Sequence, residues 1–361
     1  MEIIAAVSAG AGAPLTVRTL TLRAPRPDEV LVRVLACGIC HTDLTARAAV
    51  PATMPIVLGH EGAGVVEAVG GDVAGVAVGD RVLLTYQSCG ACPECAHGLP
   101  GYCAQWAVRN AGRFGADSPL SSESGPVVGA FFGQSSFASH VLTTPRNLVV
   151  VEPDLDPVRI AAFGCSVQTG AGVVAEVLAP DASSVLAIFG VGAVGLSALL
   201  AARALGVGTV VAVDLSPVRL ALAAELGADL VLDGGTDDVA ARIAALPGGG
   251  ASHALDTTGA APVLATALDS LTARGVLALV GLGSSPVPVD VAGLIGRGKT
   301  LRGSIEGDVD PKVFLPRLTE WYRRGLLPMD KLVREYPVHR INDAVADMVA
   351  GTVIKAVVTF P

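Results

Sequence analysis

The stretch VLAIFGVGAVG, residues 185–195, determines how the rest of the chain is interpreted. Its apolar first half is typical of a buried strand, and Gly190, Gly192 and Gly195 follow in the spacing Gly-x-Gly-x-x-Gly. The first glycine permits a tight turn, the second lets the backbone approach a pyrophosphate, and the third lets a helix pack on the strand. The stretch therefore predicts a strand, a glycine turn and a helix that bind a dinucleotide.

A second apolar run, TVVAVD, ends in Asp214 at the distance from the turn that such a site requires. A carboxylate here accepts hydrogen bonds from the ribose hydroxyls of NAD and repels the 2′-phosphate of NADP. We therefore expect NAD as the cofactor. The alternative, a tight turn without a ligand, is disfavoured because Asp214 follows at this distance.

Strand-like and helix-like segments alternate through residues 167–305. The apolar runs that we interpret as strands are VLAIFG, TVVAVD, LVLDG, HALDTTG and VLALVGLG. One helix is expected from Ser216 as its cap, with Pro217 in its first turn and Gly227 after its end. Such alternation predicts a doubly wound α/β domain with helices on both faces of a parallel sheet. The uncharged run 185–202 is long enough to cross a membrane, but its glycines favour a buried strand that leads into a helix.

The remaining segments predict a second, β-rich domain. Residues 1–166 contain short strands separated by glycine and proline turns, as in EVLVRVLACG and GAGVVEAVG. Residues 306–361 contain two helical segments, PKVFLPRLTEWYRRG and INDAVADMVAG, and then the strand KAVVTF. We expect residues 306–361 to return to the first domain, which is therefore discontinuous.

The composition is that of a folded protein with two domains. The chain has 361 residues, of which 51% are hydrophobic and 16% are charged, and this argues against disorder. The formal net charge of −8 gives no electrostatic reason to bind nucleic acid or an anionic membrane. Because the N-terminus lacks the pattern of a signal peptide, we expect a cytoplasmic protein.

Four of the seven cysteines form a tight cluster in CGACPECAHGLPGYC, at Cys89, Cys92, Cys95 and Cys103. Four thiolates close a tetrahedral shell around zinc and leave no open position, which is typical of a structural site. A zinc ribbon that reads DNA uses a similar cluster, but this segment has no basic residue. We therefore interpret the cluster as a structural zinc site.

Three further residues occur in settings that are informative together. Cys40 lies in CGICHTD, His60 in GHEGAG and Cys165 in GCSVQTG. Taken singly, a cysteine is usually a small buried apolar residue, and a lone histidine is usually structural. Taken together, these motifs resemble those of the zinc-containing medium-chain alcohol dehydrogenases. The segment GHEGAGVVEAVGGDV has the residues of that family's signature, namely Gly59, His60, Glu61, Gly64, Gly70 and Val73.

The resemblance covers essentially the whole chain and implies a Rossmann domain beside a β-rich, GroES-like catalytic domain. It implies that Cys40, His60 and Cys165 bind a catalytic zinc and leave a fourth position for water or substrate. With the cysteine cluster, two zinc ions per chain are expected, together with NAD. The implied reaction is the oxidation of a primary alcohol to an aldehyde, and its reverse.

The resemblance also implies roles for residues beside the catalytic zinc. Asp43 would orient His60. Glu61 would lie close behind the metal and ligate it transiently. Thr42 would take the proton of the alcohol, although a turn residue is the alternative interpretation of this position.

Contacts to the cofactor are expected from residues at the family's corresponding positions, namely His41, Thr169, Arg219 and Lys355, with Thr169 beside the nicotinamide. Liver-type members have a histidine where this chain has Thr45. The proton relay is therefore expected to end at His41, or to pass through the nicotinamide ribose and water.

The segments GAFFGQSSFASH, GCSVQTGAG and GDVDPKVFLPRLTEWYRRGLLPMDKLV are most similar to bacterial aryl-alcohol (benzyl alcohol) dehydrogenases. The first contains Phe131 and Phe132, which line either the substrate pocket or the core. We expect an aryl, benzylic or allylic alcohol as substrate, with a terpenoid or aliphatic alcohol as the alternative. A non-catalytic nucleotide-binding relative is disfavoured by the intact set of zinc ligands. A homodimer or homotetramer is expected.

Overall fold

The computed structural model describes residues 1–10, 13–51, 53–283 and 286–361. The chain forms two compact units, each with a core of buried aliphatic side chains. The first unit comprises Met1–Ser166, Asp310–Glu320 and Pro328–Pro361, and the second comprises Val167–Val309 and Trp321–Leu327.

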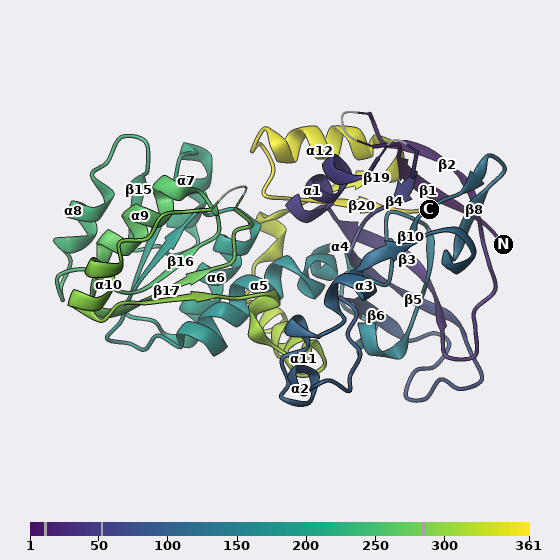
Figure 1. Ribbon diagram of the computed structural model, residues 1–361, viewed down its shortest axis with the longest axis horizontal. Helices are drawn as coiled ribbons and strands as arrows, with labels where there is room; N and C mark the ends of the chain where they lie inside the picture. The colour runs from purple at the N-terminus through teal and green to yellow at the C-terminus, as the bar shows by residue number, and fades with distance from the viewer. Residues whose placement is uncertain (11–12, 52, 284–285) are drawn as a thin grey trace. The chain divides into compact units, whose positions relative to one another are not determined.

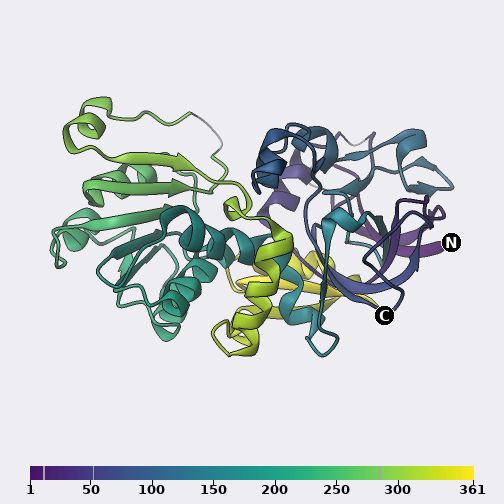
Figure 2. The ribbon, with the colours of Figure 1, turned by 90° about the horizontal axis from the view of Figure 1, so that it is seen from below.

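Within the described residues, the second unit is built on a six-stranded sheet (Figures 1 and 2). Its strands lie in the order β15-β14-β13-β16-β17-β18, and every neighbouring pair is parallel. Their bounds are Val185–Phe189 (β13), Thr209–Asp214 (β14), Leu230–Asp233 (β15), Ala251–Asp256 (β16), Leu271–Leu279 (β17) and Thr300–Gly303 (β18). The strand order reverses at β13, where doubly wound sheets bind ligands beyond the carboxyl ends of their strands. The predicted doubly wound fold is confirmed.

Helices link these strands. They are α5 (Ser166–Gly172), the π-helical segment η5 (Val173–Leu178), α6 (Ala193–Leu205), α7 (Pro217–Glu225), α8 (Val239–Ala244), α9 (Ala261–Ser270), α10 (Val291–Arg297) and the 3₁₀ turn η6 (Glu306–Asp308). The run 185–202 forms β13 and most of α6, as predicted. In the described part of the chain, no single helix is long and apolar enough to cross a membrane; one bent pair, Pro157–Gly164 with Ser166–Leu178, meets the length and composition criteria jointly.

The first unit is β-rich, as predicted. In its described residues, one sheet has the order β4-β1-β2-β8-β9, a second pairs β10 with β7, and a third has the order β12-β6-β5-β3-β20-β19 with β11 also on β3. The bounds are Glu2–Ser8 (β1), Thr16–Leu22 (β2), Val30–Gly38 (β3), Ile56–Val57 (β4), Glu61–Val69 (β5), Arg81–Leu84 (β6), Ala111–Arg113 (β7), Leu120–Ser122 (β8), Gly125–Pro126 (β9), Gly129–Phe131 (β10), His140–Thr143 (β11), Leu148–Val151 (β12), Val333–Pro337 (β19) and Lys355–Thr359 (β20). Because β20 pairs with β3, the C-terminal segment completes this sheet.

Short helices join the strands of the first unit. They are α1 (His41–Ala49), α2 (Pro93–Ala96), α3 (Trp106–Asn110), α4 (Pro157–Ile160), α11 (Pro311–Arg323) and α12 (Ile341–Val349), with the 3₁₀ turns η1 (Pro100–Tyr102), η2 (Gly115–Asp117), η3 (Pro145–Asn147), η4 (Ala161–Gly164), η7 (Met329–Lys331) and η8 (Val338–Arg340). Helix α11 ends at Arg323, within the range assigned to the second unit.

Strand pairing brings distant residues to one end of the third sheet. β3 ends at Gly38, which is paired with Glu61 at the start of β5. Cys40 therefore lies just after one strand, and His60 lies just before its antiparallel neighbour. The pairing explains why two residues separated in sequence become neighbours.

The third segment reaches the same end through a glycine. Gly164 ends η4 directly before Cys165, and its carbonyl accepts a hydrogen bond from Thr85 Oγ1 at 2.9 Å, just beyond β6. A Cβ atom at Gly164 would lie 1.9 Å from the Leu84 carbonyl oxygen. Only glycine allows this close approach, which places Cys165 beside the ends of β5 and β6.

Candidate metal centres and dinucleotide turn

The first candidate metal centre contains Cys40, His60, Glu61 and Cys165. One donor atom from each residue lies within 4.8 Å of those of the others. His60 is 1% exposed, and its Nε2 is buried without a hydrogen-bond partner among the described residues. A buried polar atom without a partner is costly, whereas a metal would satisfy it. Two thiolates and an imidazole fit zinc.

Asp43 connects the segments that carry two of these residues. Its Oδ1 accepts hydrogen bonds from His60 Nδ1 at 2.9 Å and from the Gly59 backbone at 3.0 Å. Its Oδ2 accepts a hydrogen bond from the Cys40 backbone at 2.9 Å. Because Nδ1 of His60 donates to the carboxylate, Nε2 carries the lone pair that a metal requires.

The environment favours the thiolate form of Cys40. A hydrogen bond with Cys165 lowers the pKa of Cys40 well below the usual thiol range; burial opposes this effect, and His60 adds to it. Thiolate is the form of cysteine that binds metals. Cys40 is therefore suited to act as a metal ligand.

Glu61 is paired with a lysine from the C-terminal strand. Lys355 Nζ lies 2.9 and 3.0 Å from the two carboxylate oxygens of Glu61. It also donates to Ile39 O at 2.9 Å and to Ser166 Oγ at 2.7 Å, while the Ser166 hydroxyl donates to Glu61. Burial lowers the pKa of Lys355, but the charge and hydrogen bond of Glu61 together with the charges of Cys40 and Cys165 outweigh this effect, so the net shift is upward and the ammonium stays charged.

This network gives Lys355 a structural role that the sequence did not predict. The side chain is 4% exposed, and its N–H groups have acceptors on Ile39, Glu61 and Ser166. In this structure Lys355 holds Glu61, and its expected contact with the pyrophosphate or the adenosine ribose of the cofactor stays a prediction.

Phe131 and Phe132 occupy different environments beside His60. Phe131 is 5% exposed and belongs to the buried core, and its ring meets His60 edge-on at 5.8 Å between ring centres. Phe132 is half-buried, and its ring stacks on the imidazole at 4.5 Å with an angle of 30°. Of these two residues, Phe132 therefore combines contact with His60 and partial exposure.

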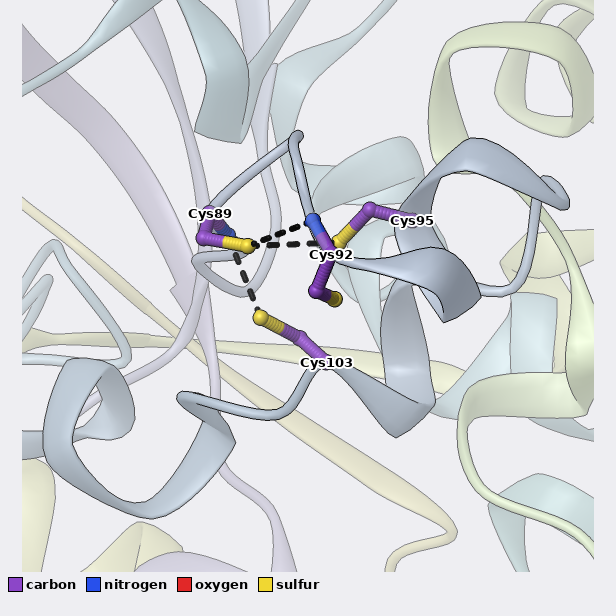
Figure 3. A group of neighbouring side chains, drawn as sticks. All are labelled: Cys89, Cys92, Cys95 and Cys103. Atoms are coloured by element: carbon purple, nitrogen blue, oxygen red, sulfur yellow. Dashed lines mark hydrogen bonds between the residues drawn. The ribbon is translucent and has the colours of Figure 1, made fainter.

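The second candidate centre is the cysteine lobe, which we define as residues 89–103. Its four cysteine sulfurs lie within 4.8 Å of one another, and Figure 3 shows them gathered around one point. The sulfurs of Cys89 and Cys95 are 3.9 Å apart, close to the roughly 3.8 Å edge of a tetrahedron with zinc–sulfur bonds of about 2.3 Å. Backbone N–H groups of Ala91 and Cys92 lower the pKa of Cys89 to about 6. The lobe fits a closed zinc site.

The predicted dinucleotide turn has the geometry that its glycines require. Gly190 has φ +84°, a region that side chains disfavour. A Cβ at Gly192 would meet nothing within 4 Å, so the backbone there is open to a ligand, whereas a Cβ at Gly195 would lie 2.0 Å from the Gly190 carbonyl oxygen. The start of α6, where a helix N-terminus favours negative charge, is therefore accessible beside Gly192.

Asp214 supports this turn. Its Oδ2 accepts a hydrogen bond from Val191 N at 2.8 Å, and its Oδ1 accepts one from Ser216 N at 2.9 Å. Arg219 Nη1 lies 3.7 Å from Oδ2, and Arg219 Nε is buried without a partner among the described residues. The two side chains are thus placed together next to the glycine turn, within the second unit.

The other predicted site residues lie in helices α1 and α5. His41 and Thr42 begin α1, where His41 is exposed and Thr42 is half-buried; Thr45 is exposed one turn later. Thr169 is half-buried in α5, and its hydroxyl lies 3.5 Å from a carboxylate oxygen of Glu306.

The family is shown by two matches that together span more than half of the chain. Residues 26–153 match the alcohol dehydrogenase GroES-like domain, and residues 193–321 match the zinc-binding dehydrogenase domain. The chain belongs to the zinc-binding alcohol dehydrogenases. The predicted family, the two-domain fold and the NAD-dependent alcohol dehydrogenase activity are thereby confirmed.

Similar proteins span this alcohol dehydrogenase from end to end. Geraniol dehydrogenase of Castellaniella defragrans is 43% identical, covering 99% of this chain and 97% of that protein. The solved structure of benzyl alcohol dehydrogenase from Acinetobacter calcoaceticus has a TM-score of 0.96 at 39% identity, with full coverage of both chains. A zinc-binding-domain alcohol dehydrogenase protein from Burkholderia ambifaria has a TM-score of 0.96 at 44% identity, covering 100% of this chain and 99% of that chain.

Three residues of this alcohol dehydrogenase escaped the sequence analysis. Ser166 contacts Glu61, and Trp106 contacts Phe132. Gln134 is 2% exposed, and its amide donates to the His60 carbonyl at 2.9 Å. Ser166 and Gln134 lie inside quoted motifs, so position in a motif is the signal that was available. Nothing in the sequence distinguishes Trp106.

Proposed function

We propose that this alcohol dehydrogenase holds two zinc ions in different roles. Cys40, His60 and Cys165 would hold the catalytic ion, and the cysteine lobe would hold the structural one. The observation that carries the proposal is the buried Nε2 of His60, which has no partner among the described residues although Nδ1 is fixed by Asp43. When bound, the catalytic zinc would act as a Lewis acid toward the alcohol oxygen.

The proton of the alcohol is proposed to leave through the start of α1. Thr42 is half-buried, and the neighbouring His41 is exposed, so these adjacent residues would pass the proton from the site to the solvent. The imidazole of a histidine can accept a proton at one nitrogen and release one from the other, so His41 is suited to pass a proton on. The alternative relay through the nicotinamide ribose predicts that a His41→Gln variant keeps its activity at neutral pH.

The dinucleotide is proposed to bind at the glycine turn of the second unit. Gly190, Gly192 and Gly195 would receive the pyrophosphate at the start of α6. Asp214 would accept hydrogen bonds from the adenosine ribose, with Arg219 beside it, and Thr169 would lie beside the nicotinamide. The nicotinamide supplies the hydride acceptor, and the protein supplies its placement.

The proposed substrates are primary alcohols whose hydroxyl-bearing carbon is attached to an unsaturated carbon. Geraniol and benzyl alcohol, named for two of the similar proteins, share this feature. The half-buried ring of Phe132 against His60 offers a flat apolar surface that can pack on a conjugated group. The alternative is a general aliphatic alcohol dehydrogenase.

The test is the ratio of kcat/KM for benzyl alcohol and geraniol to that for hexanol, with NAD. Each favourable aromatic contact contributes about 0.5–1.5 kcal/mol. This corresponds to a roughly two- to tenfold difference in kcat/KM. We expect kcat/KM for both conjugated alcohols to exceed kcat/KM for hexanol by at least this factor. The excess over ethanol should be far larger. Equal efficiency on hexanol and benzyl alcohol would support the aliphatic alternative.

A further inference from the structure

A half-buried tryptophan, Trp106, connects the cysteine lobe to the aromatic rings of Tyr86 and Phe132. Trp106 begins α3 only three residues after Cys103, and its backbone N–H donates to the Cys103 carbonyl at 2.8 Å. Its ring lies 4.9 Å from that of Tyr86, and meets the ring of Phe132 edge-on at 5.8 Å between centres. Trp106 is thus anchored to the lobe on one side and in contact with Phe132 on the other.

Phe132 is held in a conformation that it would not adopt alone. Its φ is +51°, in the left-handed region that residues with side chains disfavour unless the surroundings hold them there. Its backbone N–H donates to the Asn110 carbonyl at 3.0 Å, at the end of α3. Asn110 is 3% exposed and is bonded to both the N–H and the carbonyl of Gln87. Helix α3 therefore contacts Phe132 through both its backbone and its ring.

The ring of Phe132 in turn stacks on His60, at 4.5 Å and 30°. A chain of direct contacts therefore runs from Trp106 through Phe132 to the imidazole. Asp43 fixes one nitrogen of that imidazole through a hydrogen bond, and Phe132 limits the tilt of its plane.

We propose that Trp106 is a positioning residue. It acts through Phe132 to set the orientation of the His60 imidazole, and it sets the orientation of the Phe132 ring on which a conjugated substrate would pack. This inference rests on the proposed binding of zinc by Cys40, His60 and Cys165. Without the indole ring, a void opens beside Phe132, and Phe132 can leave its strained conformation. The imidazole then gains freedom to tilt, and the Phe132 ring no longer has one fixed orientation for packing against a conjugated substrate.

The test uses Trp106→Leu, with Trp106→Phe as the conservative variant and Val108→Ala as the control. Val108 lies on the same helix and is 80% exposed. Co²⁺ replaces the catalytic zinc, and its visible absorption spectrum reports the coordination geometry independently of turnover. In Trp106→Leu we expect a changed spectrum, release of the catalytic metal to a chelator that is roughly two- to tenfold faster, and a similar fall in the benzyl alcohol to hexanol ratio. Trp106→Phe should keep most of the wild-type spectrum, metal release rate and substrate ratio, and Val108→Ala should match the wild type in all three.

A double-mutant cycle with Phe132→Leu tests whether Trp106 acts through Phe132. We expect Trp106→Leu to have little further effect on metal release in the Phe132→Leu background, because the contact it supports is already gone. If Trp106→Leu does not fold, Trp106→Phe is used in the same cycle.

Two results would overturn the inference. One is a folded Trp106→Leu variant with the cobalt spectrum and metal release rate of the wild type. The other is an additive double-mutant cycle. If the wild type binds no metal at Cys40, His60 and Cys165, the proposed function fails as well. If the enzyme shows no benzylic preference but the spectrum changes as expected, only the substrate proposal fails.

Discussion

The Asp43 carboxylate and the His60 imidazole form a hydrogen bond of 2.9 Å between two side chains that are each 1% exposed. The same carboxylate accepts backbone hydrogen bonds from Gly59 and Cys40. One buried group thus fixes both the ring orientation of His60 and the two segments that deliver the first two proposed zinc ligands.

Replacing this carboxylate by an amide should weaken the catalytic site. Asp43→Asn keeps the size of the side chain, but its amide has one acceptor oxygen. The two carboxylate oxygens of Asp43 now accept hydrogen bonds from three donors, on His60, Gly59 and Cys40. We expect zinc affinity or activity to fall about 10- to 100-fold, measured as metal release to a chelator and as kcat/KM. The exposed Asp117→Asn serves as the control. Unchanged metal release in Asp43→Asn would contradict the assigned role of Asp43.

The buried pair of Lys355 and Glu61 gives a prediction about stability. Lys355→Met leaves the Glu61 charge buried without its partner, and such changes cost about 3–5 kcal/mol. We expect a lower thermal midpoint, and we expect the double variant Glu61→Gln/Lys355→Met to recover part of the loss, because it buries no unpaired charge. A Lys355→Met variant as stable as the wild type, but with a raised KM for NAD, would restore the cofactor role expected from the family.

The cysteine lobe is expected to contribute stability without an open catalytic position. Cys95→Ala should bind one zinc fewer and unfold at a clearly lower temperature, because structural zinc contributes directly to folding. Scanning calorimetry with metal analysis checks this result. An equally stable variant that lacks the ion would show that the lobe is dispensable.

Asp214 is predicted to set the choice between NAD and NADP. Asp214→Ala should raise the KM for NAD and reduce the discrimination against NADP, because the carboxylate that repels the 2′-phosphate is gone. Asp214 also accepts the Val191 N–H, so Asp214→Asn is the matched variant that keeps an acceptor and removes the charge. If the wild type uses NADP better than NAD, the interpretation of Asp214 is wrong.

The sequence predicted those parts of the fold and site that depend on short spacing. The glycine turn at 190–195 and the cysteine lobe each lie within a few residues, so that residue type and distance along the chain were sufficient. The buried contact of Ser166 with Glu61 and Lys355 depends instead on three distant segments that meet only in the folded first unit. No local pattern specifies such a meeting.

The adjacent residues Phe131 and Phe132 also differ in a way that the sequence alone did not predict. Phe131 ends β10 and is buried in the core, whereas Phe132 has φ +51°, and its half-buried ring stacks on His60. The sequence placed both in one motif and left pocket and core open for each. Their difference arises from the contacts of Phe132 with α3, which are not visible in the motif.

The most direct test of the two-zinc account is the zinc content and turnover of Cys165→Ala. The wild type should contain two zinc ions per chain, and the variant should lose one of them and nearly all turnover while the cysteine lobe keeps its ion. Cys37→Ala is the matched control, because Cys37 is fully buried close to Cys40 but lies outside the candidate metal groups found among the described residues; it should keep both ions. Full turnover in a Cys165→Ala variant that has lost this zinc, or a fully active wild type with one zinc per chain, would contradict the account.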